Sequence, residues 1–163
     1  MSLDWKNLLK IAYSEAEKST NPSTQNGAIL VDNKGRVVIT AQNTFPEGIA
    51  ENIERQQNKP LRYKYSVHAE RNVIYKASRL GIKTEGLTMV CPWAACGDCA
   101  QAIIQAGIKK LVVHKQALER SAHWKENIDF AFAMLREAKV EIIIFDGKIG
   151  ADKILRREEF WEP

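Results

Sequence analysis

Residues 87–114 read LTMVCPWAACGDCAQAIIQAGIKKLVVH, and the fold can be predicted outward from them. Two apolar runs, 87–91 and 110–114, have the length of buried strands. The segment 98–106 between them has helical spacing and ends at Gly107. Strand, helix and strand in this order predict two parallel strands joined by a crossover helix.

The flanking sequence continues this pattern. Its spacing predicts helices at 4–18, 67–80 and 122–138, and strands at 27–31, 36–41 and 140–145. The first two strands form a hairpin whose turn ends at Gly35, a residue that accepts positive φ. We therefore predict an α/β fold of three layers, in which a five-stranded mixed sheet is flanked by helices.

Length and charge indicate one ordinary domain. The chain has 163 residues, and 45% of them are apolar. Its 24 Lys and Arg and 20 Asp and Glu give a net charge of +4, which is spread along the sequence. The sequence contains neither the ~20-residue apolar run of a membrane span nor the apolar start of a signal peptide. We expect a single domain over residues 1–163, cytoplasmic, with no membrane and no nucleic acid as partner.

Two segments lie outside the regular pattern. The polar stretch 43–64 is longer than a normal connection, so we expect a functional loop or one that holds a short helix. The C-terminal extension 146–163 carries five large apolar residues: Ile149, Ile154, Leu155, Phe160 and Trp161. A solvated tail would not need them, and we predict a short helix that packs on this subunit or on a neighbouring one.

Cys91, Cys96 and Cys99 lie within nine residues of one another. In a reducing compartment an odd number of thiols argues against a disulfide framework and favours metal or redox chemistry. Cys96 and Cys99 have C-x-x-C spacing at the start of a predicted helix, where the helix dipole stabilises thiolates. Two alternatives to a metal site at Cys96 and Cys99 are a pair of buried structural cysteines and a thioredoxin-like redox dithiol.

His68 supplies a third possible ligand at the start of another predicted helix. In an open sheet both helix starts would project from the edge where sites form. One imidazole and two thiolates fit a zinc ion that keeps its fourth position for water. Cys91 falls inside a strand, and we predict a buried core thiol there rather than a fourth ligand. His114 and His123 are poorer candidates.

Glu70 follows His68 by two residues, a spacing that does not share a helix face. We therefore predict that Glu70 is no ligand but takes a proton from water and passes it to a substrate nitrogen. A His, two Cys and a non-ligand Glu are the set known from zinc nucleobase deaminases, and the assignment is a match to that set.

At these residues the sequence resembles the cytidine and deoxycytidylate deaminase superfamily, and most closely its deoxycytidylate (dCMP) branch. The resemblance runs over residues 21–145. The motifs that carry it are Asn21-Pro22-Ser23-Thr24-Gln25, Gly27-Ala28, Asn43 to Pro46, Tyr65, His68-Ala69-Glu70, Asn72, Cys96-Gly97-Asp98-Cys99-Ala100 and Ile103-Ile104-Gln105-Ala106-Gly107-Ile108. It implies a cytidine-deaminase-like fold and zinc-dependent hydrolysis of dCMP to dUMP and ammonia.

The resemblance also assigns roles to residues. His68, Cys96 and Cys99 would hold one Zn²⁺ and Glu70 would move the proton. Asn43 would contact the sugar hydroxyl, and the backbone of Ala69 would help to read the base. The chain departs from the family at two positions: Ala95 stands where proline is usual before the first zinc cysteine, and Asn26 stands where an apolar residue is common. If Asn26 faces the pocket, it would alter base recognition.

Substrate phosphate needs hydrogen-bond donors, which loops near the predicted site edge provide. The candidates are Asn21, Ser23, Thr24, Lys115 and Arg120. We add Asn72 to the substrate-binding candidates on the resemblance. For Trp124, helical spacing favours packing in the core, with gating of the site as the alternative.

Family members often form hexamers and respond to dCTP and dTTP, so the resemblance implies a homo-oligomer and a dCTP or dTTP effector. Deamination of dCTP itself is a variant of the same chemistry. A tRNA or single-strand deaminase would need a clustered basic, aromatic-lined track, against which the dispersed charge argues. A non-catalytic zinc-stabilised binding module would share the three ligands, and Glu70 argues against it.

Overall fold

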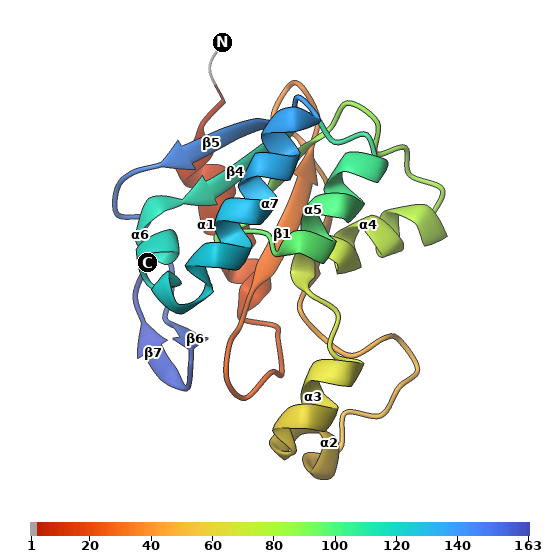
Figure 1. Ribbon diagram of the computed structural model, residues 1–163, viewed down its shortest axis with the longest axis vertical. Helices are drawn as coiled ribbons and strands as arrows, with labels where there is room; N and C mark the ends of the chain where they lie inside the picture. The colour runs from red at the N-terminus through yellow and green to blue at the C-terminus, as the bar shows by residue number, and fades with distance from the viewer. Residues whose placement is uncertain (1–2) are drawn as a thin grey trace.

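The computed structural model describes residues 3–163 and is built on a five-stranded sheet of order β2-β1-β3-β4-β5 (Figure 1). The strands are β1 (Gly27–Val31), β2 (Val37–Gln42), β3 (Thr88–Val90), β4 (Lys110–His114) and β5 (Glu141–Phe145). β1 pairs antiparallel with both β2 and β3, whereas β3, β4 and β5 are parallel. The predicted mixed sheet is therefore confirmed.

Helices cover both faces of this sheet. The helices α4 (Ala69–Arg79), α5 (Gly97–Gln105) and α7 (Lys125–Glu137) share one buried cluster with Ala28 and Leu30 of β1. The helices α1 (Trp5–Ala16) and α6 (Lys115–Glu119) share the other with Ile29 and Val31. Neighbouring residues of a strand point to opposite faces, so β1 supplies side chains to both cores and the fold has three layers.

The contact between α1 and β1 depends on a glycine. A Cβ atom at Gly27 would lie 2.2 Å from the carbonyl oxygen of Ala12 and 2.6 Å from the backbone nitrogen of Ala16. Both atoms belong to the backbone of α1, which therefore packs directly on the strand. At the other end of β1, Gly35 takes the positive φ of 78° that the predicted hairpin turn needs.

The long polar segment holds two short helices, α2 (Ile53–Gln57) and α3 (Lys59–Tyr65), as one of the two predictions for it stated. Each begins at an asparagine whose side chain accepts a hydrogen bond from the first turn: Asn52 from the backbone nitrogen of Arg55, and Asn58 from that of Leu61. Figure 1 shows both helices projecting at the lower end of the molecule.

The helix predicted in the C-terminal extension was wrong. Residues 154–161 form an antiparallel hairpin of β6 (Ile154–Arg156) and β7 (Glu159–Trp161). Backbone bonds to a distant loop hold it, since the nitrogen of Gln25 donates to the oxygen of Leu155 at 2.9 Å. The spacing of apolar residues indicates only local structure, so it could not predict this pairing between distant segments. Ile154 is buried in the cluster that α1 shares with the sheet, so the extension packs on the body of the molecule.

The predicted helix 122–138 is also divided. Its first residues form the 3-10 turn η1 (Ala122–Trp124), α7 begins at Lys125, and α6 precedes both where no helix was predicted. Within the described residues 3–163, none of the helices combines the length and the apolar character that crossing a bilayer requires.

Candidate metal centre and active site

Two helices, α4 and α5, begin at residues with metal-binding side chains. His68 is the N-cap residue of α4 and Cys96 is that of α5, and both have extended backbones, with ψ of 150° and 174°. Neither side chain caps its own helix. The amides of the two first turns have no partners within their own helices, although that of Gly97 donates to Asn127 Oδ1 at 3.1 Å. Together with the helix dipoles they favour negative charge at this place.

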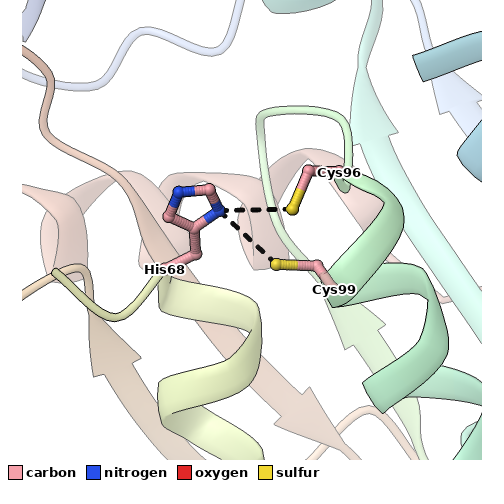
Figure 2. A group of neighbouring side chains, drawn as sticks. All are labelled: His68, Cys96 and Cys99. Atoms are coloured by element: carbon pink, nitrogen blue, oxygen red, sulfur yellow. Dashed lines mark hydrogen bonds between the residues drawn. The ribbon is translucent and has the colours of Figure 1, made fainter. Parts of the chain in front are cut away.

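The side chains of His68, Cys96 and Cys99 converge. The Nδ1 atom of His68 lies 3.5 Å from the sulfur of Cys96 and 3.5 Å from that of Cys99, and Figure 2 shows the imidazole facing both. Their three ligand atoms all lie within 4.8 Å of one another. An imidazole and two thiolates are donors that zinc prefers, so this group fits a zinc ion.

The two thiols of the group differ: the hydrogen bond to Cys96 and burial raise the pKa of Cys99, whereas Cys96 favours the thiolate. Hydrogen bonds from the Cys99 thiol and from His68 lower the pKa of Cys96, although burial opposes them. The thiolate is the form that binds a metal. Cys91 lies outside the group: it is buried in the core, and its sulfur accepts a hydrogen bond from Asn26 Nδ2 at 3.3 Å.

Glu70 lies in the first turn of α4 and is buried, with 2% of its surface exposed. Its Oε2 atom has no hydrogen-bond partner within the described structure. Burial raises the pKa of Glu70 to about 7, against the opposing charge of His68. A buried carboxyl with a free oxygen and a pKa near neutrality can accept and return a proton.

These groups open into a pocket of about 510 Å³, a size typical of sites for small molecules. His68, Cys96 and Glu70 line it. So do six of the predicted substrate-binding residues: Asn21, Ser23, Thr24, Asn26, Asn43 and Ala69. The structure therefore brings the metal group, the free carboxylate and most of the predicted substrate contacts to one cavity.

Asn43 organises the wall of this pocket. Its Oδ1 atom accepts a hydrogen bond from the backbone nitrogen of Asn26 at 2.8 Å, and its Nδ2 atom donates to the oxygen of Thr24 at 2.8 Å. Both ends of the buried amide thus fix the loop before β1. Asn26, which stands where the family commonly has an apolar residue, lines the pocket, so the condition for its effect on base recognition is met.

Three predicted residues are not brought to the pocket. Asn72 donates from Nδ2 to the oxygen of Gln42 at 2.8 Å and ties α4 to β2. Lys115 pairs with Asp146 at 2.7 Å. Arg120, a candidate for the phosphate, lies over the ring of Trp161 at 4.8 Å. None of the three lines the pocket.

Trp124 lines the pocket and is 43% exposed, so the prediction that it packs in the core was wrong. The reason is local: residues 122–124 form a 3-10 turn, whose side chains do not follow the spacing of the helix after it.

The pocket also contains residues that the sequence analysis missed. They come from α3, from the loop before α5, from the turn around η1 and from the C-terminal hairpin: Lys59, Arg62, Tyr63, Trp93, Ser121, His123, Arg156, Arg157 and Glu158. The two adjacent arginines in the extension were the feature of the sequence that could have pointed to these pocket residues. The sequence does not say that the extension returns to residues 23–25, so it could not place them.

Comparison with known proteins agrees with this geometry. The family model "cytidine and deoxycytidylate deaminase zinc-binding region" matches residues 3–115. A protein of Aliivibrio fischeri named as an uncharacterized deaminase is 30% identical over 84% of this chain and 90% of its own length. The deoxycytidylate deaminase of Mus musculus is 32% identical over 68% of this chain, and the aligned part covers 64% of the mouse protein.

A solved structure has the same fold. The dCMP deaminase of cyanophage S-TIM5, crystallised with dCMP and dUMP, superimposes with a TM-score of 0.67 and 23% identity, over 89% of this chain and 99% of that one. The likeness extends beyond residue 115, where the family match ends.

Proposed function

This chain belongs to the cytidine and deoxycytidylate deaminase family, and from that premise we propose that it converts dCMP to dUMP and ammonia. The observation that carries the proposal is the unpartnered, buried Oε2 of Glu70 in a pocket lined by two members of the metal group. The similarity to relatives named deoxycytidylate deaminase supports a deoxycytidine nucleotide as the substrate.

We propose that His68, Cys96 and Cys99 hold one zinc ion. The convergence of their donor atoms and the zinc-binding family model support this. When bound in such a site, zinc lowers the pKa of a water molecule towards ~7 and so supplies a nucleophile at neutral pH.

Glu70 then moves the protons. Its Oε2 accepts a proton from the attacking water and delivers it to the ring nitrogen beside the carbon that carries the amino group. A second transfer, from the hydroxyl that this carbon has gained, protonates the amine. The carbon–nitrogen bond breaks, ammonia leaves and the hydroxyl oxygen remains as the carbonyl of dUMP. Because only 2% of its surface is exposed, the Glu70 carboxyl meets little bulk solvent.

The pocket wall would bind the rest of the nucleoside. We propose that Asn43 contacts the sugar hydroxyl and that the backbone of Ala69 reads the base, with Asn26 and Thr24 beside them. The side chain of Asn43 already bonds the loop of residues 24–26, so its contact with the sugar would couple substrate binding to the position of that loop.

A binding module without catalysis is the main alternative from another class. It would use the three metal ligands but would have no need for a buried carboxyl whose oxygen lacks a partner, since such a group destabilises the folded protein. A nucleic-acid deaminase is not favoured, because the named relatives act on a mononucleotide.

The test is the substitution Glu70→Gln. We expect the variant to keep about one zinc per chain, since Glu70 is not a proposed ligand, and to release ammonia from dCMP at least ~100-fold more slowly. Zinc is measured by mass spectrometry of the purified protein, and ammonia by a coupled assay. Glu137→Gln, an exposed glutamate at the end of α7, is the matched control and should keep the wild-type rate.

Wild-type turnover by Glu70→Gln would refute the proposed proton transfer. Ammonia release from dCMP and from dCTP, measured separately, decides how many phosphates the substrate carries.

We further propose, from the family, a cytoplasmic homo-oligomer controlled by dCTP or dTTP. Light scattering of the protein with and without each nucleotide tests this assembly.

A further inference from the structure

We propose that the β6–β7 hairpin carries the binding site for the 5′-phosphate of the substrate, with Arg156 and Arg157 as its donors. This inference rests on the proposed deamination of a deoxycytidine nucleotide and deepens it. The hairpin lies outside residues 3–115, the part of the chain that matches the family model. It adds a pair of cations, Arg156 and Arg157, to the lining of the pocket.

The guanidinium of Arg156 is held in place on two sides. It lies over the ring of Trp93, 4.0 Å from the ring centre, and its Nη2 atom donates to the hydroxyl of Ser121 at 2.8 Å. All three residues line the pocket. A stacked and hydrogen-bonded arginine loses little further freedom when it binds an anion, because its planar fork is already oriented.

Arg156 also keeps an unused donor. Its Nε atom is buried and has no hydrogen-bond partner in the described structure. Buried polar groups are nearly always paired, so an orphaned donor in a pocket suggests a missing acceptor. Phosphate oxygens are acceptors that guanidinium groups bind especially well.

Arg157 is presented by a turn under backbone strain. Arg157 and Glu158 form the two-residue turn of the hairpin with φ of 54° and 69°, a conformation that favours asparagine and glycine. The backbone nitrogens of Arg157 and Glu158 donate to Thr24 Oγ1 at 3.2 Å and to the oxygen of Ser23 at 2.8 Å. These bonds fix the turn against the loop before β1, so the strained position is maintained by tertiary contacts.

The pocket lining carries more cations than carboxylates, since Glu70 and Glu158 are its acidic residues. Lys59 and Arg62 of α3 line the same pocket, and in residues 3–163 neither they nor the two hairpin arginines form an ion pair with a carboxylate. His123 is 3.5 Å from Arg157 through its Nδ1 atom. Some burial and the charges of both arginines lower the pKa of His123. Cations that lack carboxylate partners can neutralise a dianion.

The test compares ligands that differ only in the phosphate. Calorimetry measures the binding of dUMP and of deoxyuridine to the wild-type protein and to two single variants, Arg156→Gln and Arg157→Gln. We expect the wild type to bind dUMP at least tenfold more tightly than deoxyuridine, and each variant to lose about tenfold to a hundredfold of that preference, the range of a charge-assisted hydrogen bond.

Lys153→Gln is the matched control. Lys153 is an exposed cation of the same extension that pairs with Glu162 at 3.5 Å and does not line the pocket. It should keep the wild-type preference for dUMP. Arg157→Gln also guards against misfolding, since Arg157 is exposed and its side chain takes no part in the packing of Arg156 on Trp93. Circular dichroism checks that each variant is folded.

Equal affinity of the wild type for dUMP and deoxyuridine, or a preference that both arginine variants retain, would overturn the phosphate site. These outcomes are independent of turnover. If the wild type prefers dUMP through its arginines but releases no ammonia from dCMP or dCTP, the phosphate site stands and the proposed deamination fails.

Discussion

The three cysteines differ in what surrounds their sulfur atoms. Cys96 and Cys99 face the imidazole of His68 at the start of α5, where amides and the helix dipole favour thiolates. Cys91 lies in the core, where burial raises the pKa of its thiol far above the usual range. The sulfur atoms of Cys96 and Cys99 lie beside a further metal-binding side chain, and Cys91 is not part of that group.

This contrast predicts the effect of removing each thiol. Cys99→Ala should leave two of three proposed ligands and lose most of the zinc, whereas Cys91→Ala should retain about one zinc per chain. The measurement is the zinc content of both purified variants after dialysis against a weak chelator. Zinc loss from Cys91→Ala and retention by Cys99→Ala would reverse the assignment.

At the residue level the sequence was informative where chemistry and spacing coincide. The pair of motifs around His68 and Cys96 predicted which side chains converge, because each lies at a helix start that the strand order brings to one edge of the sheet. Lys115 shows the limit of this reasoning. It is near that edge in sequence, but its charge is paired with Asp146 across the ends of β4 and β5.

Among the elements, the packing of α1 on β1 is set by backbone atoms rather than by side chains. Gly27 is the position at which the strand meets the helix, and the space for a Cβ atom there is filled by the backbone of residues 12–16. Since backbone cannot rotate out of the way, a side chain would force the two elements apart.

Gly27→Ala should therefore lower the free energy of unfolding by about 1–3 kcal/mol, the usual range for overpacking a core. Urea denaturation followed by fluorescence measures it. Ser14→Ala, on the exposed side of the same helix, is the control and should change stability by less than ~0.5 kcal/mol. An unchanged midpoint for Gly27→Ala would mean that α1 can move away from the strand freely.

The elements that were predicted well are those with a repeating pattern, such as β4 and α5. The C-terminal extension was predicted incorrectly because its structure is set by partners far away in the chain. The backbone of Leu155 bonds Gln25, and the turn at Arg157 bonds Thr24. The same long-range pairing places the two arginines in the pocket, so the error in the fold and the missed site residues have one cause.

In the molecule as a whole, a buried hydrogen-bonded chain links three parts of the fold on the α1 side of the sheet. The hydroxyl of Tyr13 in α1 lies 2.7 Å from Nδ1 of His114 at the end of β4. The Nε2 atom of His114 lies 2.9 Å from the oxygen of Gly147 in the C-terminal extension. A neutral imidazole with its proton on Nε2 satisfies both contacts, with the hydroxyl as donor to Nδ1.

The hydrogen bonds of His114 predict that the stability of the protein depends on pH. Burial lowers the pKa of His114 in the folded protein, with the bond to Gly147 opposing it. As the pH falls below ~6.5, the unfolded chain gains a proton at residue 114 that the folded chain resists, so the free energy of unfolding decreases. Above that pH the contribution is fully present.

Denaturation of the wild type and of His114→Gln between pH 7.5 and 5 measures this effect. The wild type should lose stability more steeply below ~6.5, by up to about 1.4 kcal/mol per pH unit, which is the limit for one proton. Parallel curves for the two proteins would exclude His114 as the titrating group, whatever the difference in their absolute stability.

The most direct test of the central proposal is the initial rate of ammonia release by the purified, zinc-loaded wild-type protein, with dCMP and with cytidine at equal concentrations. A deaminase that holds a deoxycytidine nucleotide in this pocket should deaminate dCMP faster. A faster rate with cytidine would contradict the assignment of a nucleotide substrate, and the absence of ammonia from both dCMP and dCTP would contradict the proposed deamination of these nucleotides.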